Sequence, residues 1–316
     1  MNTSKSVICI IGPTASGKSQ LALELCRRGL FYRPEIISMD SAQIYKSIDI
    51  ATAKPNKKEQ NEVRHHLIDI CDPKDSYSVN KFIEDTLKII KKIEINQGTP
   101  IIVGGTMMYF NRLINGIHFV PKIPSFVRSQ IIGEGNKKGW PFLHNKLINI
   151  DPKLAKKISP SDSQRIQRGL EVWEYTGKTL SDWISSSKTK NLKRNSNYIF
   201  KTIALVPQDR SNLHKKIRTR FNNMLRNGLI EEVLQLKNRG DLSTELPAIR
   251  IVGVKQVWDY LETKSSMDDL IFKSTAATRQ LAKRQLTWLK SFKNINVVDC
   301  DEIDLSQIIS ICESPS

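Results

Sequence analysis

The sequence predicts an α/β fold, in which helices flank a parallel β-sheet and an all-helical domain is inserted into the chain. Apolar segments of strand length alternate with helical patterns over residues 1–117, as in parallel sheets with crossover helices. Residues 118–197 are interrupted by prolines and contain only short helical segments. A further apolar strand and more helical patterns then follow. We therefore expect a core domain of residues 1–117 and 198–316, with C-terminal helices, and a helical insertion domain of residues 118–197.

The elements of the first part follow from two different periods in the sequence. Short runs rich in isoleucine and valine have the length and composition of buried strands. In the longest helical segment, Ile83, Leu87 and Ile90 are spaced by four and three residues and share one helical face. The expected strands are Val7–Ile11, Glu35–Ser38, His65–Ile70 and Pro100–Val103, and the expected helices are Gln20–Arg28, Val79–Asn96 and Thr106–Ile114.

After the insertion, one apolar strand is followed by a mainly helical region. In its last helix, Leu281, Trp288 and Phe292 have the spacing of a buried face. The expected strands here are Phe200–Val206 and Asn294–Asp299, and the expected helices are Asn212–Arg226, Leu229–Lys237, Arg250–Glu262 and Met267–Phe292.

The composition favours a basic, water-soluble protein. Among 316 residues, 49 are Lys or Arg and 32 are Asp or Glu, which gives a net charge of +17. This excess favours a polyanionic partner, nucleic acid first, although a lysine-rich composition of the source organism would explain part of it. The 5 cysteines lack C-x-x-C spacing, and no apolar stretch reaches membrane-spanning length. We expect a cytoplasmic protein with no disulfide framework, no zinc site and no membrane contact.

A complete G-x-x-x-x-G-K-S sequence lies between the first strand and the first helix, which is the setting of a phosphate-binding loop. Its glycines let the backbone aim N–H groups inward, and the helix adds the positive end of its dipole. Lys18 supplies a charge for the terminal phosphate, and the Ser19 hydroxyl is placed to bind Mg²⁺. The loop alone does not distinguish ATP from another diphosphate ester. The expected phosphate-binding residues are Gly12, Pro13, Thr14, Ala15, Ser16, Gly17, Lys18 and Ser19.

Two further strand ends are expected to meet this loop, because parallel sheets bind ligands beyond the carboxyl ends of their strands. Asp40 follows the second strand and is either a general base, a metal-supporting carboxylate or a helix N-cap. The strand Pro100–Val103 ends in Gly104-Gly105-Thr106 and lacks the Asp that supports the metal in many phosphate-loop NTPases. Thr106 is expected at a helix N-cap, beside the ligand, or both.

Basic helical segments offer further phosphate contacts. Arg220 suits a bidentate clamp on a phosphate, and Arg165 and Arg168 share a helical face that suits a phosphate backbone. From the sequence alone, a solvated basic face explains these arginines as well or better.

Several sequence blocks resemble those of one family. Gly12–Ser19 is similar to G-P-T-A-S-G-K-[ST], Asp40–Tyr45 to D-S-x-x-[IV]-Y, and Val103–Tyr109 to V-G-G-T-x-x-Y. Further similar blocks are Ala51–Pro55, Gln164–Arg165, Arg168–Glu171, Ile249–Gln256 and Thr278–Leu289. By these blocks the chain resembles the bacterial tRNA isopentenyltransferases of the MiaA type, the IPP transferase family. It departs from the family in Ala51, where Gly is usual, and in Val254-Lys255, where Tyr-Arg is commoner.

This resemblance implies a P-loop NTPase-like fold and a tRNA-modifying enzyme. The family transfers a dimethylallyl group from dimethylallyl diphosphate to N6 of adenine-37, beside the anticodon of tRNAs that read codons beginning with U. It implies that Arg220 helps the loop to hold the diphosphate and that Mg²⁺ binds at Ser19. Asp40 would accept the proton of the amine, and Thr106 would bond near the flipped base. The implied catalytic residues are Asp40, Thr106, Lys18 and Arg220.

The resemblance also implies contacts with a tRNA anticodon stem-loop in both domains, with Arg128 covering the site. The implied contacts are Asp40, Ser41, Ala42, Gln43, Thr106, Arg128, Gln164, Arg165, Ile166, Gln167, Arg168, Arg250, Ile251, Val252, Gly253, Val254, Lys255, Lys283, Arg284, Gln285, Leu286, Thr287, Trp288, Leu289 and Lys290. We expect the enzyme to be a monomer.

Three other classes of protein are weighed against this one. A P-loop kinase of a nucleoside or small metabolite is disfavoured by the missing strand-end Asp and by the basic surface. An adenylate isopentenyltransferase, which acts on free nucleotide, is disfavoured by the basic insertion and C-terminal helices. A non-catalytic RNA-binding protein would not need Lys18 and Ser19 in an intact loop.

Overall fold

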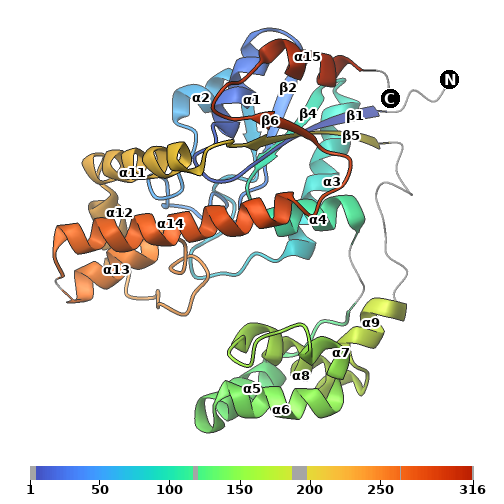
Figure 1. Ribbon diagram of the computed structural model, residues 1–316, viewed down its shortest axis with the longest axis vertical. Coiled ribbons are helices and arrows are strands. Elements are labelled where there is room, and N and C mark those ends of the chain that lie inside the picture. The colour runs from blue at the N-terminus through green and yellow to red at the C-terminus, as the bar shows by residue number, and fades with distance from the viewer. Residues whose placement is uncertain (1–4, 117–119, 187–197, 264, 315–316) are drawn as a thin grey trace. The chain divides into compact units, whose positions relative to one another are not determined.

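The structure is a computed structural model that describes residues 5–116, 120–186, 198–263 and 265–314 (Figure 1). The chain divides into two compact units, one of Met1–Ile114 with Ser196–Ser316 and the other of Asn115–Asn195. The predicted domain boundaries fall on residues 117–118 and 197, which lie outside the described residues.

The larger unit is built on a parallel sheet, as the sequence predicts. Among the described residues, 6 strands pair in the order β3-β2-β4-β1-β5-β6, and every pairing is parallel. Val7, Cys9 and Ile10 of the central strand are fully buried, as expected where helices cover both faces. The strands are β1 (Lys5–Ile11), β2 (Pro34–Ser38), β3 (Arg64–His66), β4 (Thr99–Gly104), β5 (Tyr198–Val206) and β6 (Asn296–Asp299).

The register brings the ends of the central strands to one level. Ile11 at the end of β1 pairs with Gly104 of β4 and with Ala204 of β5, and Ser38 at the end of β2 pairs with Val103. The segments that follow β1, β2 and β4 therefore start close together at one edge of the sheet.

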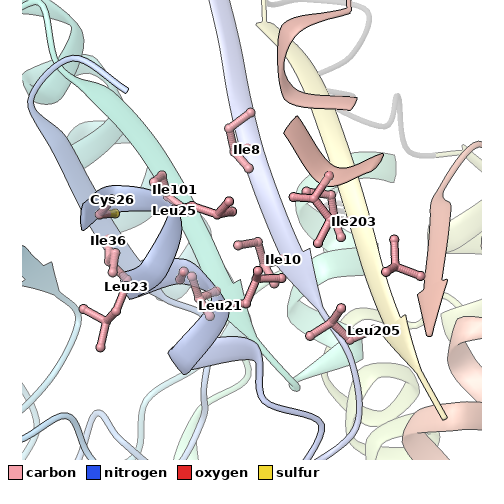
Figure 2. Packing of buried hydrophobic residues seen from close by; sticks show 14 of the residues in the cluster. Ile8, Ile10, Leu21, Leu23, Leu25, Cys26, Ile36, Ile101, Ile203 and Leu205 are labelled. Carbon is pink, nitrogen blue, oxygen red and sulfur yellow. The ribbon is translucent and has the colours of Figure 1, made fainter. Parts of the chain in front are cut away.

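Helices cover both faces of the sheet (Figure 1). On one face, Leu21 and Leu25 of α1 pack in one cluster with Ile8 and Ile10 of β1, as Figure 2 shows. No helix in the described part of the chain is both long enough and apolar enough to cross a membrane. The helices of this unit are α1 (Lys18–Arg27), α2 (Lys57–Glu62), α3 (Val79–Ile95), α4 (Met107–Asn115), α11 (Arg210–Arg226), α12 (Leu229–Asn238), α13 (Val254–Thr263), α14 (Met267–Leu289) and α15 (Leu305–Glu313).

Two of these helices, α2 and α15, are absent from the prediction. Helix α2 buries no residue, so no apolar period marks it, and it starts with a capping box of Asn56 and Glu59. Helix α15 follows its N-cap Asp304, whose carboxylate accepts hydrogen bonds from two backbone N–H groups. Its apolar side chains pack against the core around Ile308. Helix α2 is therefore set by its cap, whereas α15 has both a cap and a short apolar face that the prediction overlooked.

Two predicted boundaries are also wrong. Strand β3 is shorter than the predicted His65–Ile70, because Leu67 and Asp69 have φ angles of 60° and 56°, which end the extended backbone. Helix α13 begins at Val254 rather than at Arg250, because Gly253 before it has φ of 98°.

The smaller unit is helical throughout its described residues and has a hydrophobic core of its own. Leu143 and Leu147 of α6 pack in this core with Ile166 and Leu170 of α8. Gly169 allows the close approach, because a Cβ there would lie 2.9 Å from Leu147 Cδ1. The helices are α5 (Ser125–Lys138), α6 (Trp140–Ile150), α7 (Pro152–Ala155), α8 (Ser163–Thr176) and α9 (Leu180–Ser186).

Gly104 lies where the sheet edge has no room for a side chain. A Cβ at Gly104 would lie 2.1 Å from the Met39 carbonyl oxygen. We expect Gly104→Ala to lower the free energy of unfolding by about 3 kcal/mol, because the backbone at the end of β2 must move. Gly133→Ala is the control, since no atom lies within 4 Å of the added Cβ and Ala favours a helix by about 1 kcal/mol. Denaturant titrations compare the variants, and equal stabilities would contradict this account.

Candidate active site

One cavity lies at the sheet edge where β1, β2 and β4 end. Its volume is about 600 Å³, and its lining residues all belong to the larger unit. Lys18, Asp40 and Thr106 line it from three different loops, as the strand ends predict, and Arg220 lines it from α11. The structure thus brings the four residues predicted as catalytic into one cavity.

The phosphate loop has a backbone shaped for an anion. Gly17 has φ of 85° and Ala15 has φ of 62°, both in the left-handed region. Helix α1 begins directly after it at Lys18, so the N–H groups of its first turn have no carbonyl partner within the helix. A Cβ on Gly12 would lie 2.7 Å from the Leu205 carbonyl oxygen, which leaves glycine as the residue that fits.

Two half-buried cations, Lys18 and Arg220, lie beside this loop. Burial lowers the pKa of the Lys18 ammonium to about 8, while Asp40 raises it and Arg220 lowers it further. Burial also lowers the pKa of Arg220, again opposed by Asp40, although a guanidinium stays charged. Lys18 Nζ donates to the Pro13 carbonyl at 2.6 Å. Asp40 offsets only part of the positive charge of Lys18 and Arg220. A bound polyphosphate would neutralise the rest.

Asp40 and Thr106 are joined through the turn after β2. Asp40 Oδ1 accepts the N–H of Ala42 at 2.8 Å. Thr106 Oγ1 accepts the N–H of Ser41 at 2.9 Å and donates to Ser41 Oγ at 3.2 Å. The Thr106 hydroxyl therefore bonds the neighbouring loop instead of capping α4. Within the described chain Asp40 Oδ2 has no hydrogen-bond partner, so one carboxylate oxygen is left for a ligand.

Glu232, which the sequence did not single out, fixes one wall of the cavity. This residue of α12 accepts the backbone N–H groups of residues 49–51 at 2.7, 2.7 and 2.9 Å. The same loop is tied to Gln43, whose Nε2 donates to the carbonyls of Thr52 and Ala53. Glu232 and its partners are 181 to 183 residues apart, so no local pattern indicates the contact.

The tRNA contacts predicted on α14 differ in how exposed their side chains are. Lys283 and Arg284 are exposed. Trp288 is 39% exposed and lines the cavity, so its prediction as part of the buried face was wrong. Gln285 is turned inward and hydrogen-bonds the phosphate loop.

Four of the predicted tRNA contacts belong to the hydrophobic interior. Their side chains pack against neighbouring apolar residues and are too buried to meet a nucleic acid, which corrects the prediction at these positions. They are Ile166, Val254, Leu286 and Leu289.

In the smaller unit, several predicted tRNA contacts gather around one buried acid. Glu171 is 1% exposed and accepts hydrogen bonds from Arg128 Nε at 3.2 Å, Arg168 Nη1 at 2.7 Å and Gln167 Nε2 at 3.3 Å. Arg165 is exposed and lies 3.5 Å from Asp162. The carboxylate of Glu171 thus orients two of the basic side chains of this unit.

The sheet and its loop define a protein with a P-loop NTPase-like fold, in which the cavity combines the phosphate loop with Asp40. A model of the family described as IPP transferase matches residues 43–292. The chain belongs to the IPP transferase family.

Relatives of known name are similar over nearly the whole chain. The tRNA dimethylallyltransferase of Coxiella burnetii (strain RSA 493 / Nine Mile phase I) is 47% identical over 310 residues, which cover 98% of this chain and 97% of the relative. The tRNA dimethylallyltransferase of Paraburkholderia xenovorans (strain LB400) is 44% identical over 298 residues, which cover 94% of this chain and 93% of the relative.

Solved structures agree with this assignment. A tRNA isopentenylpyrophosphate transferase from Bacillus halodurans aligns with a TM-score of 0.67 and 32% identity, over 97% of this chain and 93% of that one. A eukaryotic dimethylallyltransferase acting on tRNA aligns with a TM-score of 0.75 and 29% identity, over 96% of this chain and 75% of that one.

Glu232→Gln tests whether the carboxylate holds the cavity wall. The amide retains one acceptor oxygen but loses the charge that strengthens the three bonds, so we expect the free energy of unfolding to fall by about 2 kcal/mol. Glu231→Gln is the matched control, because Glu231 is exposed in the same first turn of α12 and interacts equally with the helix dipole. Urea unfolding measures both variants. Equal losses of stability in the two variants would show that the effect comes from the helix dipole and not from the bonds to residues 49–51.

Proposed function

We propose that this protein transfers a dimethylallyl group from dimethylallyl diphosphate to N6 of adenine-37 in tRNAs that read codons beginning with U. The products are N6-(dimethylallyl)adenosine and diphosphate. The observation that carries the proposal is one cavity that combines the desolvated cations Lys18 and Arg220 with the open carboxylate oxygen of Asp40. Membership of the IPP transferase family and relatives named tRNA dimethylallyltransferase support it.

The phosphate loop would stabilise a leaving group. Negative charge builds on the diphosphate as the allylic C1–O bond breaks, and the loop N–H groups, Lys18 and Arg220 would bind that charge. Ser19 lines the cavity with its hydroxyl at the first turn of α1, and a hydroxyl with phosphate oxygens and water is a ligand set that suits Mg²⁺. Mg²⁺ held there would add further neutralisation of the diphosphate.

Asp40 would take the proton that the adenine amine must lose. N6 forms a bond to C1 of the dimethylallyl group as the bond from C1 to the diphosphate oxygen breaks, and the N6 proton passes to Asp40 Oδ2. Thr106, tied to Ser41, would hydrogen-bond near the base. The base must leave its stack to reach the cavity.

The tRNA anticodon stem-loop would contact basic residues of both units. The net charge of +17 supports a partner with a phosphate backbone. We expect a monomeric enzyme that acts in the cytoplasm. The contacts that burial leaves open are Asp40, Ser41, Ala42, Gln43, Thr106, Arg250, Ile251, Val252, Lys255, Lys283, Arg284, Thr287, Trp288 and Lys290 in the larger unit and Arg128, Gln164, Arg165, Gln167 and Arg168 in the smaller one.

The reaction is tested directly by incubating the protein with Mg²⁺, dimethylallyl diphosphate and an unmodified tRNA that carries adenines at positions 36–38. Mass spectrometry of the nucleosides should show a five-carbon addition at adenine-37. Addition to free AMP instead would assign the protein to the adenylate isopentenyltransferases. ATP-dependent phosphorylation of a small molecule, with no addition to tRNA, would overturn the proposal in favour of a kinase.

The variant Asp40→Asn tests whether Asp40 acts as the general base or only binds tRNA. The amide keeps an oxygen for the N–H of Ala42 but does not accept the proton of the amine, so turnover should fall by about 100-fold or more. The affinity for tRNA should stay close to that of the wild type. Asp268→Asn makes the same change at an exposed position of α14 and should leave turnover unchanged. Saturating turnover and filter binding measure the two effects, and a loss confined to tRNA affinity would make Asp40 a binding residue.

A further inference from the structure

Gln285 of α14 lies buried between two loops of the cavity. Its Oε1 accepts the N–H of Thr14 in the phosphate loop at 2.9 Å, and its Nε2 donates to the Gly105 carbonyl at 2.8 Å. Because a backbone N–H only donates and a carbonyl only accepts, these partners determine the orientation of the amide. One side chain thus connects the loop after β1 with the end of β4.

The first half of the phosphate loop has few other constraints in the described structure. The N–H of Ser16 reaches the Pro13 carbonyl at the long distance of 3.4 Å. The other bond to this carbonyl comes from Lys18 Nζ, and a phosphate would compete for the ammonium because it carries the opposite charge whereas the carbonyl is neutral. The bond between Thr14 and Gln285 is therefore a constraint on the loop that does not depend on where the Lys18 ammonium lies.

The surroundings leave room for this amide and little else. A Cβ on Gly105 would lie 2.5 Å from Gln285 Nε2, so a glycine is needed at the end of β4 for the side chain to fit. Gln285 itself is only 9% exposed. Both ends of this buried amide are already hydrogen-bonded within the protein, and little of its surface is left for a nucleic acid.

We propose that Gln285 is a positioning residue for the diphosphate and not the tRNA contact that the family resemblance implies. The inference rests on the proposed function in one respect, that the diphosphate belongs to the prenyl donor. Through Thr14 the amide holds the loop in its anion-binding shape, and through Gly105 it holds the loop against β4. Arg284 and Trp288 of the same helix also line the cavity, but unlike Gln285 they are exposed, so they stay available for tRNA.

Gln285→Met tests the proposal, because Met has a similar volume but cannot replace either hydrogen bond. Gln280→Met is the matched control, with the same replacement at an exposed position of α14. Inorganic pyrophosphate with Mg²⁺ is titrated into each protein by calorimetry, and tRNA affinity is measured by filter binding. We expect Gln285→Met to bind pyrophosphate about tenfold more weakly, as when an orienting partner of a binding group is removed. Its tRNA affinity should match that of the control.

Steady-state kinetics provide the second readout. The KM for dimethylallyl diphosphate should rise in Gln285→Met, while the KM for tRNA stays at the value of the Gln280→Met control. Weaker tRNA binding with unchanged pyrophosphate binding would overturn the proposal and make Gln285 a tRNA contact. Equal losses for both ligands would overturn it as well, because they indicate general damage to the fold.

Two features keep the test decisive. If Gln285→Met does not fold, amide exchange measured by NMR on the wild type replaces it, and rapid exchange of the Thr14 N–H without ligand would contradict the proposal. The pyrophosphate titration requires no prenyl transfer. A protein that binds pyrophosphate through Gln285 but never modifies tRNA would therefore refute the proposed function and support this inference.

Discussion

The parallel pairing that brings the ends of β1, β2 and β4 to the same level is the constraint on which the rest of the structure depends. Parallel pairing sets Ile11 beside Gly104 and Ser38 beside Val103, so three loops begin at the same height. Gly104 allows the Met39 carbonyl to approach where any side chain would collide. The core maintains this register, because a slip by one residue would exchange the two buried faces of each strand. The geometry of the cavity is thus a consequence of how the sheet packs.

The charges in the cavity are balanced only in part. Burial lowers the pKa values of Lys18 and Arg220, and Asp40 is the carboxylate that opposes both shifts. A ligand with several negative charges gains most from such a site, since each cation has already lost part of its hydration.

Sequence patterns were sufficient where neighbours in the chain decide the structure. The phosphate loop, the central strands and the meeting of Lys18 with Asp40 follow from glycine positions and apolar runs that act locally. Patterns were insufficient where contacts are distant, since Gln285 and Thr14 are 271 residues apart. Helical spacing also placed Trp288 in the interior, although the cavity exposes that side of α14. Helix α2 was missed because it buries no side chain and leaves no apolar period to detect.

The buried carboxylate of Glu171 has a consequence for the RNA contact proposed for the smaller unit. Long arginine side chains usually lose much conformational freedom when they bind a phosphate. Here Arg128 and Arg168 are held by Glu171 before any ligand arrives, so part of that entropy is already lost on folding. The two guanidinium groups keep a definite separation and direction, and a phosphate backbone must match it. In the proposed complex, this arrangement would favour one folded RNA shape over another, and not merely RNA over other polyanions.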